Sequence, residues 1–148
     1  MDIELLKIQA EGYLRTARGM LVRDGVYFPM LYAVSEESTL PIGLNAENEG
    51  DKREITEIMA AMKNKCDAMI LIMDMYLIEF DKKPKEDPVN IKDDPRSTPA
   101  LVCFLYTKNE SFMRQFQYTK RENFNFFDFD WEKFDEMSGK FESPFKKN

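Results

Sequence analysis

The sequence predicts a single α+β domain, built as one mainly antiparallel sheet of five strands with helices packed on it. Two segments carry apolar side chains at helical spacing, and several segments rich in aromatic and aliphatic residues lie between turn signals. A chain of 148 residues with 43% hydrophobic side chains is long enough to bury one core. The predicted order is helix, strand, strand, helix, strand, strand, strand and short terminal helix, within one domain spanning residues 1–148.

The first helix is predicted from apolar side chains that recur every three or four residues from Ile3 onward. Gly12 and Gly19 weaken this helix, and either Gly19 or Gly25 is expected to mark its end. One stripe of the helix should therefore pack on the sheet. Its members are Leu6, Ala10, Tyr13, Leu14, Ala17, Met20 and Leu21.

A hairpin and a second helix are predicted next. Residues 27–34 and 39–44 are rich in strand-forming side chains and flank the polar SEES, and Pro41 indicates that the second strand lies at an edge or bulge. The second helix is expected to begin near Asp51 because apolar side chains then recur at helical spacing. These side chains are Ile55, Ile58, Met59, Met62 and Cys66.

The middle of the chain predicts strands around a long loop. The run MILIMDMYLIEF is apolar at both parities of the strand repeat, as in a strand covered on both faces. Residues 81–99 hold four prolines and many charges, which predicts a mobile loop. Beyond this loop, ALVCFLYT and SFMRQFQYT flank the turn KNES and predict an antiparallel hairpin.

The stretch NFNFFDFDWEKFDEM, residues 123–137, concentrates phenylalanines, the single tryptophan and acidic side chains. Phe127, Trp131 and Phe134 are spaced four and three, which predicts the inner face of a short helix that packs on the sheet or on a second chain. A calcium loop starting at Asp128 would need Gly at its sixth position and Glu at its twelfth, where Lys133 and Gly139 stand. No metal site is predicted here, and residues 138–148 are expected to form a tail.

Composition excludes several classes of function. The net charge of −6, from 21 basic and 27 acidic side chains, disfavours nucleic acid and anionic membranes as partners. No apolar run is long enough to span a bilayer and MDIELLKIQAEG lacks the features of a signal peptide, so we expect a cytoplasmic protein. The absence of histidine excludes imidazole-based catalysis and zinc motifs, and no cofactor is predicted. Cys66 and Cys103 are expected to be buried, reduced thiols.

One polar site is a candidate for chemistry. Asp74 interrupts an apolar strand, where a carboxylate needs a partner such as Arg96 or Arg114, unless it meets solvent near a sheet edge. The long loop adds Asp93, Asp94 and Arg96, a mixture of charges that suits an anion or a metal. A solvated loop is the alternative, since the segment matches no phosphate-binding motif.

Two functional hypotheses follow. The first is a protein-interaction or regulatory module that acts as a homodimer, because methionine and aromatic side chains adapt to partner surfaces. The alternative is a carboxylate-based enzyme or metal-binding protein that uses Asp74 and the 93–96 loop. The candidate interface of the first hypothesis consists of Met59, Met62, Phe127, Trp131 and Phe134.

Some motifs are similar to those of known groups. DGVYFPMLYAV, the trio DMY and a loop containing DPR before ALVCFLY resemble, over residues 14–107, a group of bacterial and phage proteins to which no activity is assigned. In that group an acidic residue and tryptophan stand at the positions of Asp74 and Tyr76, so the tyrosine is a departure. The order of elements also resembles roadblock and longin-like scaffolds, which implies a dimeric or regulatory platform by analogy of fold alone.

Overall fold

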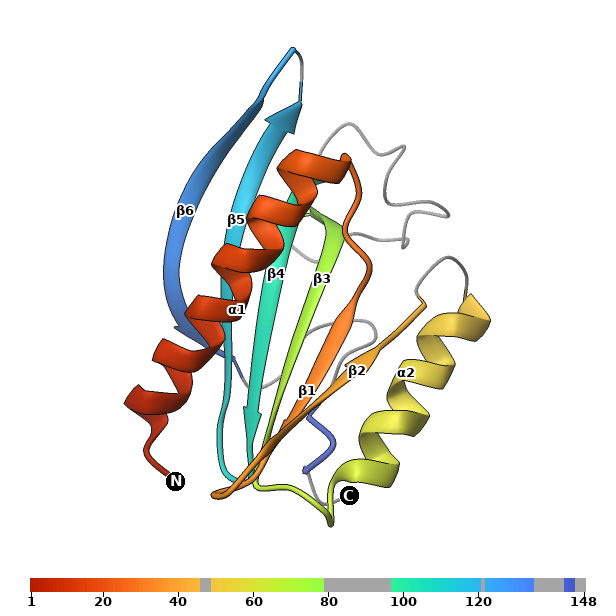
Figure 1. The fold of residues 1–148 in the computed structure, drawn as a ribbon, viewed down its shortest axis with the longest axis vertical. Helices are drawn as coiled ribbons and strands as arrows, with labels where there is room; N and C mark the ends of the chain where they lie inside the picture. Colours follow the sequence, from red (N-terminus) through yellow and green to blue (C-terminus); the bar gives the residue numbers. More distant parts are fainter. Residues whose placement is uncertain (46–48, 79–96, 121, 135–142, 146–148) are drawn as a thin grey trace.

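The computed structural model describes residues 1–45, 49–78, 97–120, 122–134 and 143–145. Within these residues two helices pack on one open antiparallel sheet whose strand order is β2-β1-β3-β4-β5-β6 (Figure 1). The α+β prediction is confirmed, but the predicted count of five strands is wrong because the sheet has six. The elements are α1 (Ile3–Asp24), β1 (Met30–Val34), β2 (Thr39–Gly43), α2 (Glu49–Met62), β3 (Ala68–Ile78), β4 (Ser97–Thr107), β5 (Ser111–Lys120) and β6 (Phe124–Lys133).

Helix α1 lies across one face of the sheet, over β3 and β4 (Figure 1). Asp2 caps its start by accepting a hydrogen bond from the backbone N–H of Glu4 at 2.9 Å. Gly25 ends it in the left-handed conformation, with φ of 75°. Of the seven predicted members of the apolar stripe, five are buried, Tyr13 is partly buried against the same core, and Met20 is 38% exposed. The five buried members are Leu6, Ala10, Leu14, Ala17 and Leu21.

The opposite face of the sheet has a second core cluster. Helix α2 contributes the buried Ile55 and Met59, which pack with side chains from β1, β3 and β4. Because both faces are covered, every side chain from Ala100 to Tyr106 in β4 is buried. The thiols of Cys66 and Cys103 are also buried, as predicted.

The two edges of the sheet are different in length. Strand β2 is a short edge strand that carries Pro41, and Pro41 pairs with Tyr32 of β1, in agreement with the predicted edge hairpin. Strand β6 forms the other edge with ten residues (Figure 1). A partner segment therefore has a much longer edge available on the β6 side.

The predicted C-terminal helix is wrong, because residues 124–133 form β6. Phe124 and Phe126 lie on one face of this strand and Phe127 and Phe129 on the other, and pairing with β5 overrides the helical spacing. A bulge between Met113 and Gln115 then shifts the phase of the pairing by one residue. Phe127 and Phe134 consequently face the α2 side and Trp131 faces the α1 side, so these three residues do not share a face.

Two predicted irregular segments are only partly described. Ser97–Pro99 belong to β4 and not to the predicted 81–99 loop, whose remaining residues lie outside the described part of the chain. Of the predicted tail, only residues 143–145 are described, and Phe145 packs against the core cluster on the α2 side.

Candidate functional site

The α1 side of β6 is held in place by aromatic packing. Phe124 and Phe126 stack with ring centroids 5.9 Å apart, and Tyr118 of β5 lies 5.5 and 5.6 Å from them. The Arg18 guanidinium of α1 lies 4.7 Å from the centre of the Phe116 ring and 5.8 Å from that of Phe126. Such cation–π contacts contribute about 0.5–1 kcal/mol each at exposed sites. They connect the helix to β5 and β6.

A polar network centred on Arg114 of β5 continues this connection. Arg114 donates a hydrogen bond to Glu11 of α1, and its Nη2 lies 3.1 Å from both carboxylate oxygens of Asp128 in β6. The indole N–H of Trp131 donates to the same Oε1 of Glu11 at 2.7 Å. The Arg114 side chain is only 12% exposed. One guanidinium therefore joins three elements through two carboxylates.

The charge of Arg114 is stable in this position. Burial lowers the pKa of Arg114, but hydrogen bonds to Asp128 and the charges of Glu11 and Asp128 outweigh this effect, and the net result is a raised pKa. Among the described residues its buried Nε has no hydrogen-bond partner. Because the guanidinium is permanently charged, the network positions β6 and does not exchange protons.

The side of β6 that faces away from α1 carries exposed aromatic rings. Phe127 pairs with Gln117 and Phe129 with Gln115, which places both rings on the α2 side of the sheet. Phe127 is 56% exposed and Phe129 is 37% exposed. We call this surface, made by Phe127, Phe129, and the exposed edge of β6, the β6 flank.

Acidic side chains surround the β6 flank. Asp130 and Glu132 are exposed, and Asp128 is 57% exposed despite its contact with Arg114. The Asp130 Oδ1 accepts a hydrogen bond from the backbone N–H of Trp131 at 2.7 Å, which occupies that amide. The bulge opposite Arg114 also interrupts the regular edge at this point. The regular part of the edge is therefore the first half of β6.

Asp74 lies on the α1 side near the end of β3, where it is half-buried. Among the described residues, the Tyr118 hydroxyl donates a hydrogen bond to its Oδ1 at 2.6 Å. Arg114, one of the two predicted partners, binds Glu11 and Asp128 instead. Burial raises the pKa of Asp74, and the hydrogen bond from Tyr118 partly opposes this. The same burial and the nearby carboxylate raise the pKa of Tyr118.

The residues of the predicted interface occupy different environments. Met59 is buried, and Met62 and Phe134 pack against the core cluster on the α2 side. Trp131 is half-buried against Glu11, so Phe127 is the predicted interface residue with the most exposed ring. Phe129 was not predicted. The alternation of Phe127 and Phe129 with Asp128 and Asp130 was the available signal for a strand with exposed aromatic rings on one face.

The other predicted site residues give no assembled centre. Asp93, Asp94 and Arg96 lie outside the described residues, so their relation to Asp74 stays a prediction. At the opposite end of the sheet an open, mainly polar hollow of about 500 Å³ is lined by Glu36, Asp67, Lys108 and Glu110, among others. The described part of the chain has no group of three or more acidic or cysteine side chains arranged to hold a metal ion. Neither described helix is long and apolar enough to cross a membrane.

In comparisons with known proteins, no protein-family model, no curated protein and no solved structure matches this chain.

Proposed function

We propose that the chain is a protein-interaction module that binds an extended segment of another protein along the β6 flank. The observation that carries this proposal is the pair of exposed rings, Phe127 and Phe129, on one face of a ten-residue edge strand. An edge strand offers backbone hydrogen bonds to an added strand, and pockets or rings on one face select its alternate side chains. The Arg114 network keeps this edge in a fixed position.

The charges of β6 favour a basic partner. The strand carries Asp128, Asp130 and Glu132 against a single Lys133. A second copy of β6 paired edge to edge would bring like charges together, which is a common way to block self-pairing of edge strands. An extended segment with lysine or arginine at some positions and apolar side chains at alternate positions would complement both features.

The contribution of Phe127 to binding can be estimated from the exposed area of its ring. Fully burying a phenylalanine side chain contributes about 1.5–3 kcal/mol, so covering the exposed half of Phe127 contributes about 1 kcal/mol or slightly more. This corresponds to about a fivefold to tenfold change in the dissociation constant. Phe127→Ala should therefore weaken binding by that factor and leave the fold intact.

The test uses synthetic peptides and backbone amide chemical shifts. A ten-residue peptide of alternating Lys and Val should shift the amide signals of residues 124–130, more strongly at low salt than at high salt. Alternating Glu and Val, and a peptide with the same Lys and Val in blocks, serve as controls. The proposal fails if the Lys–Val peptide shifts no β6 amide, or if the Glu–Val peptide shifts them equally.

A second candidate function is carboxylate-based chemistry at Asp74, favoured by its raised pKa and its short hydrogen bond from Tyr118. Thermal melts with magnesium or calcium test it, since a bound ion raises the melting temperature. The rise should appear in the native chain and disappear in Asp74→Asn. No rise with either ion in the native chain would exclude the metal-dependent form of this function.

A further inference from the structure

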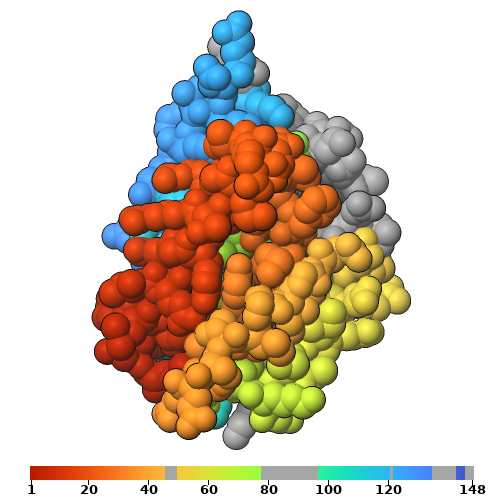
Figure 2. Space-filling model, in the orientation of Figure 1, coloured from red at the N-terminus to blue at the C-terminus, as the bar shows by residue number. Residues whose placement is uncertain are grey.

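The surface of α1 that faces away from the sheet is partly apolar. Leu5 is 64% exposed, Ile8 is 65% exposed and Val22 is 52% exposed. At 100° per residue these three side chains lie opposite the buried stripe of the helix. Figure 2 shows α1 as the outermost segment on this face, with no other described segment over it. Large apolar side chains are therefore exposed to water along one line on the surface of α1.

We call the residues along the exposed side of α1 its outward line. They are separated by alternating steps of three and four residues, which is the spacing found where two helices pack along their length. Gly12 and Gly19 lie on this line, and apart from the adjacent residues and the backbone of α1 itself, no atom lies within 4 Å of the position that a Cβ would take at either one. Their backbone does not require glycine, since Gly25 is the residue with positive φ among those described. The full line consists of Leu5, Ile8, Gly12, Arg15, Gly19 and Val22.

Glycine inside a helix lowers helix stability relative to alanine. Gly12 and Gly19 fill no tight space within the chain, so the packing of a single copy does not explain either one. A missing side chain does, however, leave a depression into which a side chain of another helix fits. Such a depression at Gly19 lies one heptad from that at Gly12 and suits a helix that runs along α1.

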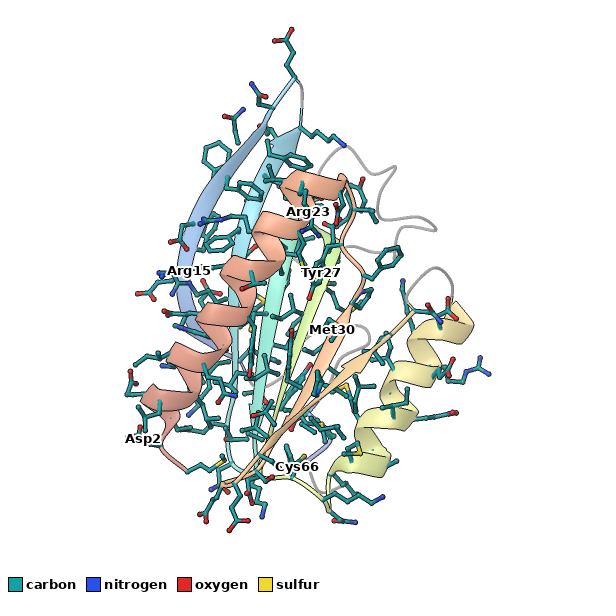
Figure 3. The ribbon with its side chains drawn as sticks, in the orientation of Figure 1. Asp2, Arg15, Arg23, Tyr27, Met30 and Cys66 are labelled. Atoms are coloured by element: carbon teal, nitrogen blue, oxygen red, sulfur yellow. The ribbon has the colours of Figure 1, made fainter. Side chains whose placement is uncertain are left out.

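The charges of α1 identify the helix that would fit. Its exposed charged side chains are Glu4 near the start and Arg15, Arg23 and Asp24 in the second half, whereas Glu11 and Arg18 contact β5 and β6. Asp2 and Arg23 lie at opposite ends of the helix, with Arg15 between them (Figure 3). A second copy in antiparallel orientation brings Glu4 to the level of Arg23 of the other copy, whereas a parallel copy aligns Glu4 with Glu4 and Arg23 with Arg23. The side chains of α1 carry three negative and four positive charges within a chain of net charge −6, so the helix does not share the excess negative charge that drives two copies apart.

We propose that two copies of the chain associate through the outward line of α1, packed antiparallel about a two-fold axis. With the axis at the middle of the helix, between residues 13 and 14, Ile8 faces Gly19 of the other copy and Leu5 faces Val22. The exposed Ile8 side chain then enters the depression left by Gly19, and the arrangement repeats on the other side of the axis. This proposal places self-association on α1 and not on Met59, Met62 or the β6 flank.

The expected dimer is weak. A 22-residue helix is about 33 Å long, and one helix face buries an area at the low end of specific protein interfaces. The dissociation constant is therefore expected on the order of 10 µM. Sedimentation velocity from 1 to 500 µM should show a shift from monomer to dimer across this range.

Gly19→Leu is the decisive variant. It fills the depression and should weaken association at least tenfold, while helix propensity predicts an unchanged or higher melting temperature of the monomer. A dimer that persists in Gly19→Leu overturns the proposal, as does a native chain that stays monomeric up to 500 µM. Phe127→Ala is the matched control, since it alters the β6 flank and should leave association unchanged. The two proposals can thus fail separately.

Cross-linking tests the orientation. In the antiparallel arrangement, an equal mixture of Ile8→Cys and Gly19→Cys should form a disulfide-linked dimer under mild oxidation. Ile8→Cys alone should not, because the two Ile8 positions are then separated by about 16 Å along the helix axis. The native thiols Cys66 and Cys103 are buried and do not compete. Cross-linking of Ile8→Cys with itself, at the same rate as the mixture, would contradict the antiparallel arrangement.

Discussion

Replacing Arg114 with methionine tests whether the network of Arg114, Glu11, Asp128 and Trp131 holds β6 against α1. The substitution keeps much of the side-chain volume but removes the charge and every hydrogen bond. Glu11, whose side chain is 26% exposed, keeps the indole N–H of Trp131 as a donor, while Asp128 is 57% exposed and recovers hydration. Hydrogen bonds to charged groups contribute about 1.5–3 kcal/mol, so we expect a net loss of about 2–3 kcal/mol in the free energy of unfolding.

Urea unfolding followed by circular dichroism measures this loss, and a thermal melt should show a decrease of about 5–10 °C. The double variant Glu11→Gln with Arg114→Met removes both charges of this partly buried pair. It should be more stable than the sum of the two single effects predicts, with a coupling of about 1 kcal/mol or more. Asp128→Asn is the control, and it should cost less than 1 kcal/mol because Asp128 is more exposed. Additive single effects, or an Arg114→Met variant as stable as the native chain, would refute the reasoning.

Three further predictions concern Trp131, the two faces of β6, and Asp74. Trp131→Phe keeps a ring but loses the hydrogen bond to Glu11, so urea unfolding should show a loss of about 1–1.5 kcal/mol; equal stability would show that this bond contributes nothing. Phe126→Ala should cost about 2–3 kcal/mol and Phe127→Ala less than 1 kcal/mol in the same assay, because Phe126 packs under α1 and Phe127 is exposed; the reverse order would contradict the register of β6. Burial raises the pKa of Asp74 above 3.8, so its contribution to stability is greatest below pH 3.8 and is lost as pH rises through the folded-state pKa. Asp74→Asn should therefore raise the melting temperature at pH 7 and have a smaller effect at pH 3, whereas a lower melting temperature at pH 7 would mean that the ionised carboxylate is needed.

The interior of the fold could be predicted from the sequence because its signals are local. The buried stripe of α1, its end at one of the two candidate glycines and the two-faced apolar pattern of β3 all follow from side-chain periodicity and backbone preference. The hairpin of β4 and β5 follows from a short polar turn between two strand-forming segments. Each of these signals lies within about twenty residues, so no knowledge of the tertiary arrangement is needed.

The outer strand could not be predicted in the same way. The spacing of Phe127, Trp131 and Phe134 fits one face of a helix, and the bulge in the pairing of β5 with β6 is what separates these residues onto two faces. The sequence of β6 does not show the bulge, because it arises from pairing with a strand that ends at Lys120. The partner of Asp74 also depends on strand pairing. Tyr118 lies 44 residues away in the sequence, and its side chain reaches Asp74 across β4, because β3 and β5 both pair with β4.

The Arg114 network also determines how the two proposed surfaces relate to each other. Glu11 belongs to α1, while Asp128 and Trp131 belong to β6, so movement of β6 away from the sheet breaks hydrogen bonds to the helix. The β6 flank and the outward line of α1 nevertheless use different side chains, on opposite sides of the sheet. A partner strand at β6 would therefore leave the outward line of α1 exposed, and the two contacts are sterically compatible at the level of these side chains. It follows that loss of Arg114 should weaken both contacts, whereas loss of Phe127 or of the depression at Gly19 should weaken only one.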